Sequence, residues 1–290
     1  MLPAIRKLSS EEFPPSLLEI PEPPEELYVQ GDLPDASYTY LTVVGSRKYS
    51  IYGQEACEKI ISELAGYPIV IVSGLAIGID TIAHKAALAT GLKTLAVPGS
   101  GLDRAVLHPS SNRRLADEII KAGGAILSEF PPTYPAGLHT FPKRNRIMAG
   151  LARGVLIIEA GDKSGTLITA RLATDYNRDV YVIPGSIFAP GSAGTNGLIR
   201  QGATPIISGR DLLQALGFEL PTETGSQLAL QLENLSPGEK KVVEILSIEP
   251  LPRDELFRQL DLSTSEANSL IGIMEIKGLI VESVGEIRLT

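Results

Sequence analysis

A repeated alternation of short apolar runs and helical patterns constrains the chain most strongly. Strands that are apolar on both faces and separated by crossovers of helix length are typical of a parallel sheet covered on both sides. Right-handed crossovers then predict an α/β fold, a Rossmann-like doubly wound parallel sheet, over residues 40–216. The predicted strands are Tyr40–Val44, Ile69–Val72, Thr94–Val97, Ala125–Leu127, Val155–Ile158, Val180–Ile183 and Pro205–Ile207. Helices are expected near residues 50–65, 80–90, 111–122, 143–151, 166–177, 194–200 and 209–216.

Three further regions flank this predicted domain. Residues 1–39 are rich in Pro and Glu and are expected to form an extended, non-helical lead-in. Residues 217–235 are expected to be a linker, because they carry no Lys or Arg and contain a polar Thr-Glu-Thr-Gly-Ser-Gln stretch. Residues 236–290 predict three helices followed by a hairpin around Gly285, which is the pattern of a small C-terminal winged-helix-like domain.

The composition excludes several classes of protein. Charged residues, Gly or Pro interrupt every stretch of eighteen residues, so no membrane-spanning helix is expected. A single Cys excludes a disulfide-stapled scaffold. The opening residues have no apolar core typical of a secretory signal, and we therefore expect a cytoplasmic protein.

Charge is unevenly distributed along the chain. The net charge is -8, yet residues 40–210 carry 18 basic and 12 acidic side chains, whereas the segments before and after this block are all net acidic. A basic block inside an acidic chain is compatible with a polyanionic partner. An even spread of these charges over the folded surface is the alternative, because segment sums do not describe the fold.

Small, hydroxylated or Gly-rich residues follow most of the predicted strands. Ligands of open parallel sheets bind beyond the carboxyl ends of the strands, where backbone N–H groups at helix starts point outward. We therefore expect an anion-binding rim at this edge of the sheet. The loops that form it are residues 45–49, 73–80, 98–101, 159–166 and 184–186.

Two common phosphate-binding motifs are absent. No Gly-x-Gly-x-x-Gly follows the first predicted strand, and no acidic residue ends the second, which disfavours a nicotinamide or flavin enzyme. Lys163-Ser164 lacks the glycine spacing of a P-loop, which disfavours a P-loop NTPase. No cofactor is expected.

The densest cationic cluster is the hexapeptide from Phe141 to Arg146, at a predicted helix start. Three cations and an amide beside an aromatic ring suit phosphate contacts together with base stacking. A solvated helix face is the alternative interpretation of the same residues. The cluster comprises Phe141, Pro142, Lys143, Arg144, Asn145 and Arg146.

Candidate catalytic groups are weak, and neither a catalytic residue nor a metal site is expected. The three histidines, His84, His108 and His139, lack metal-ligand spacing and favour structural roles. Cys57 favours a core position, and Asp80 suits a helix cap. Glu129 and Glu159 each follow a predicted strand and could form a carboxylate pair, but their separation is left open.

The combination of these motifs resembles the DNA-processing protein A family, DprA, also called Smf. The resemblance extends in order over residues 14–216 and includes the segment before the first predicted strand. Its motifs are Val43-Val44-Gly45-Ser46-Arg47, the stretch Ser73–Asp80 with His84, Phe141–Ile147, Glu159–Arg171 and Val182–Ser186.

This resemblance implies a non-catalytic protein that binds single-stranded DNA without marked sequence preference. It also implies a homodimer that helps to load the RecA recombinase during natural transformation or recombination. The DNA-contacting residues it implies are Arg47 in the Gly-Ser-Arg loop and the cluster Arg144, Asn145 and Arg146, with Lys143 added by adjacency. Together with the rim, the predicted nucleic-acid-binding set becomes Arg47, Lys48, Ser73, Gly74, Phe141, Lys143, Arg144, Asn145, Arg146, Lys163, Ser164, Gly165 and Thr166.

The sequence departs from the family pattern in two places. Many members begin with a further helical domain, whereas only about 12 residues precede the Phe-Pro-Pro segment here. The predicted recognition helix Ser263–Lys277 carries Glu266 and Glu275 against Lys277 alone, which suits a duplex major groove poorly. We therefore expect the small domain to contact proteins or to self-associate.

Two other functions fit a Rossmann-like scaffold. One is an enzyme that cleaves nucleoside monophosphates, as in the lysine-decarboxylase-like family. Its Pro-Gly-Gly-x-Gly-Thr loop and following Glu are not reproduced by residues 161–166. The other is a nucleotide-sensing module that binds a small phosphate ligand in the same rim.

Overall fold

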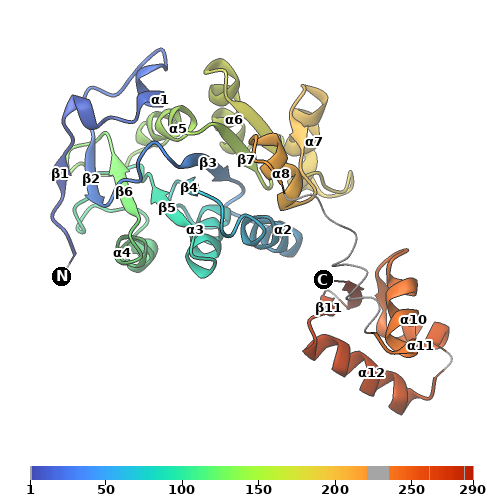
Figure 1. The fold of residues 1–290 in the computed structure, drawn as a ribbon. Coiled ribbons are helices and arrows are strands. Elements are labelled where there is room, and N and C mark those ends of the chain that lie inside the picture. Colours follow the sequence, from blue (N-terminus) through green and yellow to red (C-terminus); the bar gives the residue numbers. More distant parts are fainter. Residues whose placement is uncertain (1, 221–234, 261, 284, 290) are drawn as a thin grey trace. The chain divides into compact units, whose positions relative to one another are not determined.

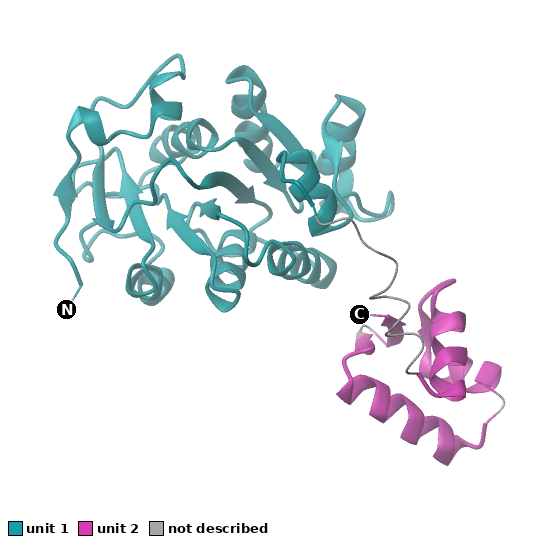
Figure 2. Cartoon of the chain, viewed as in Figure 1, with its two compact units in different colours: residues 1–220 teal, residues 221–290 magenta. Residues whose placement is uncertain are grey.

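The computed structural model describes residues 2–220, 235–260, 262–283 and 285–289. It divides the chain into two compact units, residues 1–220 and residues 221–290 (Figure 2). Of the predicted linker, residues 221–234 lie outside the described part. The preceding residues belong to the large unit, because the ring of Phe218 packs edge-on against Tyr67 with centroids 5.4 Å apart.

A nine-stranded sheet forms the centre of the large unit, in the order β1-β2-β6-β5-β4-β3-β7-β8-β9. The seven strands from β6 to β9 are parallel, and β1 and β2 run antiparallel at one edge. The strands are β1 (Arg6–Lys7), β2 (Tyr28–Gly31), β3 (Thr39–Val44), β4 (Ile69–Ser73), β5 (Lys93–Ala96), β6 (Ala125–Ser128), β7 (Gly154–Ile157), β8 (Asp179–Val182) and β9 (Thr204–Pro205).

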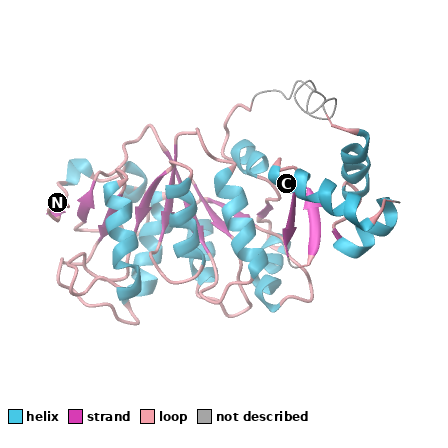
Figure 3. Ribbon diagram, turned by 90° about the horizontal axis from the view of Figure 1, so that it is seen from below, coloured by secondary structure: helices cyan, strands magenta, loops and turns pink. Residues whose placement is uncertain are grey.

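Helices cover both faces of this sheet (Figure 1, Figure 3). One face packs against α1 (Pro15–Leu18), α5 (Thr140–Leu151), α6 (Thr166–Asp175) and α7 (Ala193–Arg200). The other packs against α2 (Ile51–Ser62), α3 (Ile79–Ala89), α4 (Arg113–Lys121) and α8 (Gly209–Ala215). Because the central strands are covered on both sides, β4 is buried at every position, as its Ile-Val-Ile-Val sequence predicts. The predicted Rossmann-like doubly wound sheet is confirmed.

The lead-in is more structured than predicted. Its expected extended conformation is wrong for α1, which begins at Pro15, a residue tolerated in the first turn of a helix. The side chain of Leu17 is fully buried and lies next to Gly150 of α5. Strand β2 pairs with β6 and so extends the sheet.

The small unit is a winged helix. It contains α10 (Pro237–Leu246), β10 (Leu251–Pro252), α11 (Arg253–Leu260), α12 (Thr264–Ile276), β11 (Ile280–Ser283) and β12 (Glu286–Leu289). Capping boxes begin α10 and α12, with Ser236 paired to Glu239 and Ser263 paired to Glu266. The three strands form an antiparallel sheet in the order β10-β12-β11.

Candidate nucleic-acid interface

The strand order places a binding site at one point of the large unit. The chain winds from β3 through β4 and β5 to β6 in one direction, and from β7 through β8 to β9 in the other. The order therefore reverses between β3 and β7, and a crevice forms beyond the carboxyl ends of strands at such a reversal. A pocket of about 700 Å³ lies there, lined by the loops after both strands and by the start of α5.

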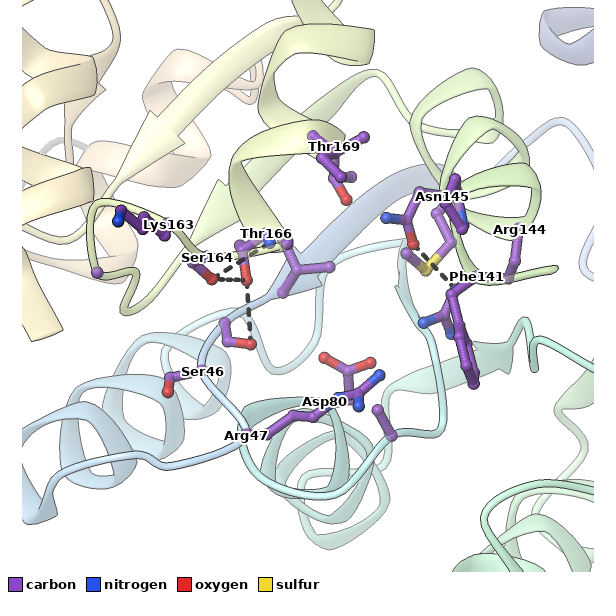
Figure 4. A pocket seen from close by; sticks show the side chains of 18 of the residues that line it. Ser46, Arg47, Asp80, Phe141, Arg144, Asn145, Lys163, Ser164, Thr166 and Thr169 are labelled. Carbon is purple, nitrogen blue, oxygen red and sulfur yellow. Dashed lines mark hydrogen bonds between the residues drawn. The ribbon is translucent and has the colours of Figure 1, made fainter. Parts of the chain in front are cut away.

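Nine of the thirteen predicted binding residues line this pocket. Figure 4 shows Lys163, Ser164 and Thr166 on one side of it and Phe141, Arg144 and Asn145 on the other, with Arg47 and Asp80 between them. Ser73, Gly74, Lys143 and Arg146 do not line it. The nine are Arg47, Lys48, Phe141, Arg144, Asn145, Lys163, Ser164, Gly165 and Thr166.

Arg47 combines an exposed cation with an aromatic ring. It follows β3 in the Gly-Ser-Arg loop, and its guanidinium carbon lies 5.4 Å from the centroid of the Phe141 ring. Lys48 and Lys163 are also exposed. Within the described residues, none of these three cations forms an ion pair with a carboxylate. They therefore present positive charge that no direct ion pair takes up.

The loop after β7 is tied to the loop after β3. The hydroxyl of Thr166 donates to the carbonyl of Gly45 over 3.2 Å, and the backbone N–H of Thr166 donates to Ser164 Oγ over 3.2 Å. These bonds position Lys163 and Gly165 at the pocket, where α6 begins. Backbone N–H groups at the start of a helix favour an anion.

Arg144 forms a wall of the pocket rather than an exposed contact. Its side chain is only 6% exposed, and Nη1 donates to the carbonyls of Gly74 and Val97, the latter over 2.7 Å. Its Nε donates to Asn145 Oδ1 over 3.1 Å and orients that amide beside the pocket. Burial lowers the pKa of Arg144, although the nearby Asp80 carboxylate favours its charged form.

Gly74 and Asp80 complete the setting of this arginine. The backbone N–H of Gly74 donates to Asp80 Oδ2 over 3.1 Å, and a Cβ on Gly74 would overlap the Arg144 guanidinium. Burial raises the pKa of Asp80, and the neighbouring Arg144 opposes this shift. Gly74 therefore acts by leaving room for the guanidinium, and Asp80 does more than cap a helix.

The remaining predicted binding residues have structural or separate positions. Arg146 forms an ion pair with Glu129, and both side chains are largely buried. Ser73 is buried and its hydroxyl donates to the carbonyl of Val43 over 2.7 Å. Lys143 is exposed but lies outside the pocket lining. Assigning Arg146, Ser73 and Gly74 to direct contact with a ligand does not fit these surroundings.

Glu129 and Glu159 do not form the carboxylate pair that the sequence left open. Glu129 pairs with Arg146, whereas Glu159 accepts hydrogen bonds from the N–H and hydroxyl of Ser50, over 2.9 and 2.7 Å. The fold thus uses both carboxylates to join elements. Cys57 is buried in the core, where burial raises the pKa of its thiol.

Several apolar pocket residues escaped the sequence analysis. Leu138, before α5, is 91% exposed, and Ile168, in the first turn of α6, is 45% exposed. Met148 and Thr169 complete the lining from the inner faces of the same two helices. Their sequence signal is position alone, because Ile168 and Thr169 lie within the Glu159–Arg171 motif and Leu138 and Met148 flank the cationic hexapeptide. Together with Phe141 they give the pocket an apolar surface beside its cations.

Within the described ranges there is no group of three or more His, Cys, Asp or Glu side chains placed to hold a metal ion. Among the described helices, none combines the length and apolar character required to span a bilayer. Fold and site together define a Rossmann-like protein with a cationic, aromatic-lined pocket at its topological switch point.

Comparison with known proteins identifies the family. Residues 4–217 match the family model of DNA recombination-mediator protein A, and residues 227–286 match that of the DprA winged helix domain. The chain belongs to the DprA/Smf family of DNA-processing proteins. The resemblance stated from the sequence motifs is thereby confirmed.

Named relatives support this assignment over the large unit. The chain is 44% identical to Protein Smf of Escherichia coli over 73% of its own length and 56% of that protein, and thus spans little more than half of this relative. It is 46% identical to DNA processing protein DprA of Streptococcus pneumoniae over 71% of this chain and 72% of that protein.

Solved structures show the same fold. The X-ray structure of DNA processing protein A from Streptococcus pneumoniae superimposes with a TM-score of 0.68 at 43% identity and covers 75% of both chains. A Helicobacter pylori structure, described as giving insight into the unique single-stranded DNA binding mode of DNA processing protein A, gives a TM-score of 0.65 at 30% identity. It covers 74% of this chain and 96% of that one.

Proposed function

We propose that the chain binds single-stranded DNA in the pocket between β3 and β7. The observation that carries this proposal is the exposed guanidinium of Arg47 against the Phe141 ring, with Lys48 and Lys163 unpaired on the same pocket within the described residues. Cations beside an aromatic face match the phosphate and base of one nucleotide. The Helicobacter pylori neighbour, whose title names single-stranded DNA binding, supports this choice of ligand.

The biological role that we propose is recombination mediation without catalysis. A homodimer would protect incoming single strands and load the RecA recombinase onto them in natural transformation or recombination. The family description as a recombination-mediator protein supports this role. Glu129 and Glu159 are both engaged by neighbouring groups, Glu129 by Arg146 and Glu159 by Ser50. These structural contacts explain why the two carboxylates are present, so neither is needed as a reacting group. We also propose a cytoplasmic location.

Fluorescence anisotropy of a labelled oligonucleotide of about thirty nucleotides tests the proposal directly. We expect the single strand to bind more tightly than the duplex. If about four phosphates are neutralised, log K against log salt should have a slope near -3. Arg47→Ala should weaken binding by about 1–3 kcal/mol, because it removes a charge-assisted contact.

A matched control separates this site from general charge. The side chain of Arg114 on α4 is 91% exposed, pairs with Glu118 and does not line the pocket, so Arg114→Ala removes the same charge outside the pocket lining. Its affinity should equal that of the wild type. Equal losses in both variants, or no binding at low salt, would contradict the proposal.

A nucleotide-processing or nucleotide-sensing function is the second candidate. The pocket volume of about 700 Å³ lies within the range of small-molecule sites. Competition by nucleoside monophosphates distinguishes the two. A strand-binding protein should release its oligonucleotide only at monophosphate concentrations far above the oligonucleotide Kd, because a monomer makes one set of contacts. Displacement at equal concentrations would favour the small-molecule function.

A further inference from the structure

An exposed apolar surface lies outside the pocket, on the side of Lys163. None of its residues belongs to the pocket lining. Phe188 and Ile187, in the loop after β8, are 89% and 85% exposed, and Tyr52 at the start of α2 is 48% exposed. Tyr49, just before α2, is also exposed. We call these four residues, Tyr49, Tyr52, Ile187 and Phe188, the aromatic strip.

Hydrogen bonds connect the elements that carry the strip with one another and with the loop after β7. The hydroxyl of Tyr52 donates to the carbonyl of Pro184 over 2.6 Å, which fixes its ring between α2 and the loop after β8. The N–H of Ala160 donates to the carbonyl of Gly191 over 2.8 Å, so this loop lies beside the loop that carries Lys163. The strip is therefore continuous with the pocket edge.

The chemistry of the strip differs from that of the pocket. Residues 49–54 and 183–195 contain no charged side chain, and the adjacent Glu159 is buried and bound by Ser50. Lys48 directly precedes Tyr49 in the chain, and Lys163, next to Asp162, lies in the adjacent loop after β7. Flat uncharged rings flanked by cations suit nucleotide bases whose phosphates lie on the cations.

We propose that the aromatic strip stacks the bases of single-stranded DNA that continues out of the pocket, with Phe188 as the main platform. This inference rests on the proposed function and adds the direction of the strand, from the pocket across the start of α2 to the loop after β8. A protein surface is the other possible occupant of an exposed apolar patch. Continuity with the cationic pocket favours the nucleic acid.

An oligothymidylate length series tests the strip separately from the pocket. Oligomers of about four nucleotides should occupy the pocket alone, and those of about twelve should also reach the strip. We expect Phe188→Ala to bind the short oligomers as the wild type does and the long ones about 5- to 140-fold more weakly, because one stacked base is lost. Ile248→Ala, which removes an equally exposed side chain from the small unit, should change neither affinity.

Abasic oligomers distinguish stacking from charge. A long abasic oligomer keeps every phosphate but lacks the bases outside its first few nucleotides. The wild type should bind it more weakly than the normal long oligomer, because only the phosphates of the added nucleotides then contribute to the affinity. Phe188→Ala should discriminate less than the wild type between the abasic and normal long oligomers, because one of the stacked bases is already lost. A wild type that does not discriminate between them would overturn the proposal.

Fluorescence gives a direct signal, because the chain contains no Trp. In Phe188→Trp the single indole should be quenched by long oligomers and not by short ones, whereas Ile248→Trp should stay unquenched with both. No binding of any oligomer by the wild type would refute the proposed function itself. Two results would refute base stacking on the strip while leaving the proposed function intact. One is an indole in Phe188→Trp that stays unquenched although the oligomers bind normally. The other is a Phe188→Ala variant whose affinity matches the wild type at every oligomer length. A Phe188→Ala variant that alters only self-association would assign the strip to a protein contact.

Discussion

The two units of the chain treat their cations differently. At the pocket of the large unit, Arg47, Lys48 and Lys163 are exposed and form no ion pair within the described residues. In the winged helix, Arg253 contacts both Glu275 and Glu282, Arg258 contacts Glu255, and Lys277 contacts Glu239. Pairing with carboxylates reduces what these three cations of the winged helix offer to a phosphate backbone.

This difference shows why a count of charges along the sequence is an incomplete guide to function. Arg144 and Arg47 are equal in the sequence count, yet one is enclosed by carbonyls and the other faces the pocket opening. The relevant quantity is the positive charge left without an internal partner. On this basis we propose that the large unit binds nucleic acid. Protein contact by the small unit stays a prediction from its acidic recognition helix.

The largest expected effect comes from removing the buried cation. Arg144→Ala leaves the carbonyls of Gly74 and Val97 without their donor and Asp80 without its counter-charge. Breaking such a buried arrangement costs about 3–5 kcal/mol. We expect the free energy of unfolding of the large unit, measured by urea titration with circular dichroism, to fall by this amount. Arg114→Ala should change it by less than about 0.5 kcal/mol. If Arg144→Ala lowers the free energy of unfolding by less than about 1 kcal/mol, the buried hydrogen bonds of this arginine do not stabilise the large unit as we expect.

The next largest expected effect is a difference between the two units in how their stability depends on pH. Burial lowers the pKa of His84 to about 3, against about 6.5 in an unfolded chain. Below pH 6.5 the unfolded chain binds a proton that the folded chain does not, so the stability contributed at neutral pH is lost as the pH falls toward 3. The contribution of His84 to this loss, measured as the difference between the wild type and His84→Gln, should be about 1.4 kcal/mol per pH unit, or roughly 3 kcal/mol at pH 4.5.

The histidine variants and the small unit provide the controls for this pH dependence. His84→Gln should have a flatter stability profile than the wild type between pH 6.5 and 4.5, whereas His139→Gln, which alters an exposed side chain, should follow the wild type. The small unit contains no His, and hydrogen bonds hold the pKa of Glu239 and Glu266 below their ordinary value. Its stability should therefore decline only below about pH 4.5. Parallel profiles for the wild type and His84→Gln would contradict this assignment.

Most of the fold could be predicted from the sequence, because buried parallel strands such as β4 carry a continuous apolar run that few other structures require. The antiparallel strands β1 and β2 at one end of the sheet were missed. Prolines surround them, and β2 is defined by pairing with β6, which lies about a hundred residues further along the chain. Local pattern does not encode such pairing.

The site shows the same limit. The motifs identified the loops, but the roles of the arginines on α5 depend on direction. Successive residues of a helix are about 100° apart, so Arg144 and Arg146 point to different sides. One side faces Gly74 and Val97, and the other faces Glu129. The sequence of the helix does not show which neighbours lie on each side, because tertiary packing places them there.

The smallest expected effect is a change in the salt dependence of DNA binding. It compares Lys163, a cation of the large unit without an ion pair in the described residues, with Arg253, a paired cation of the small unit. Lys163→Gln should reduce the magnitude of the salt slope for single-stranded DNA by about 0.7, because one phosphate contact is lost, and should weaken affinity a few-fold at low salt. Arg253→Gln removes the same charge from the small unit and should leave both quantities unchanged. Its effect should instead appear as a loss of about 1 kcal/mol or less in the stability of the small unit, since the side chains of its ion pairs are 35% to 39% exposed. Both variants are compared with the wild type by anisotropy across a salt series. If Arg253→Gln lowers the slope as much as Lys163→Gln does, the winged helix also contacts DNA, and the division of labour inferred from the pairing of cations is wrong.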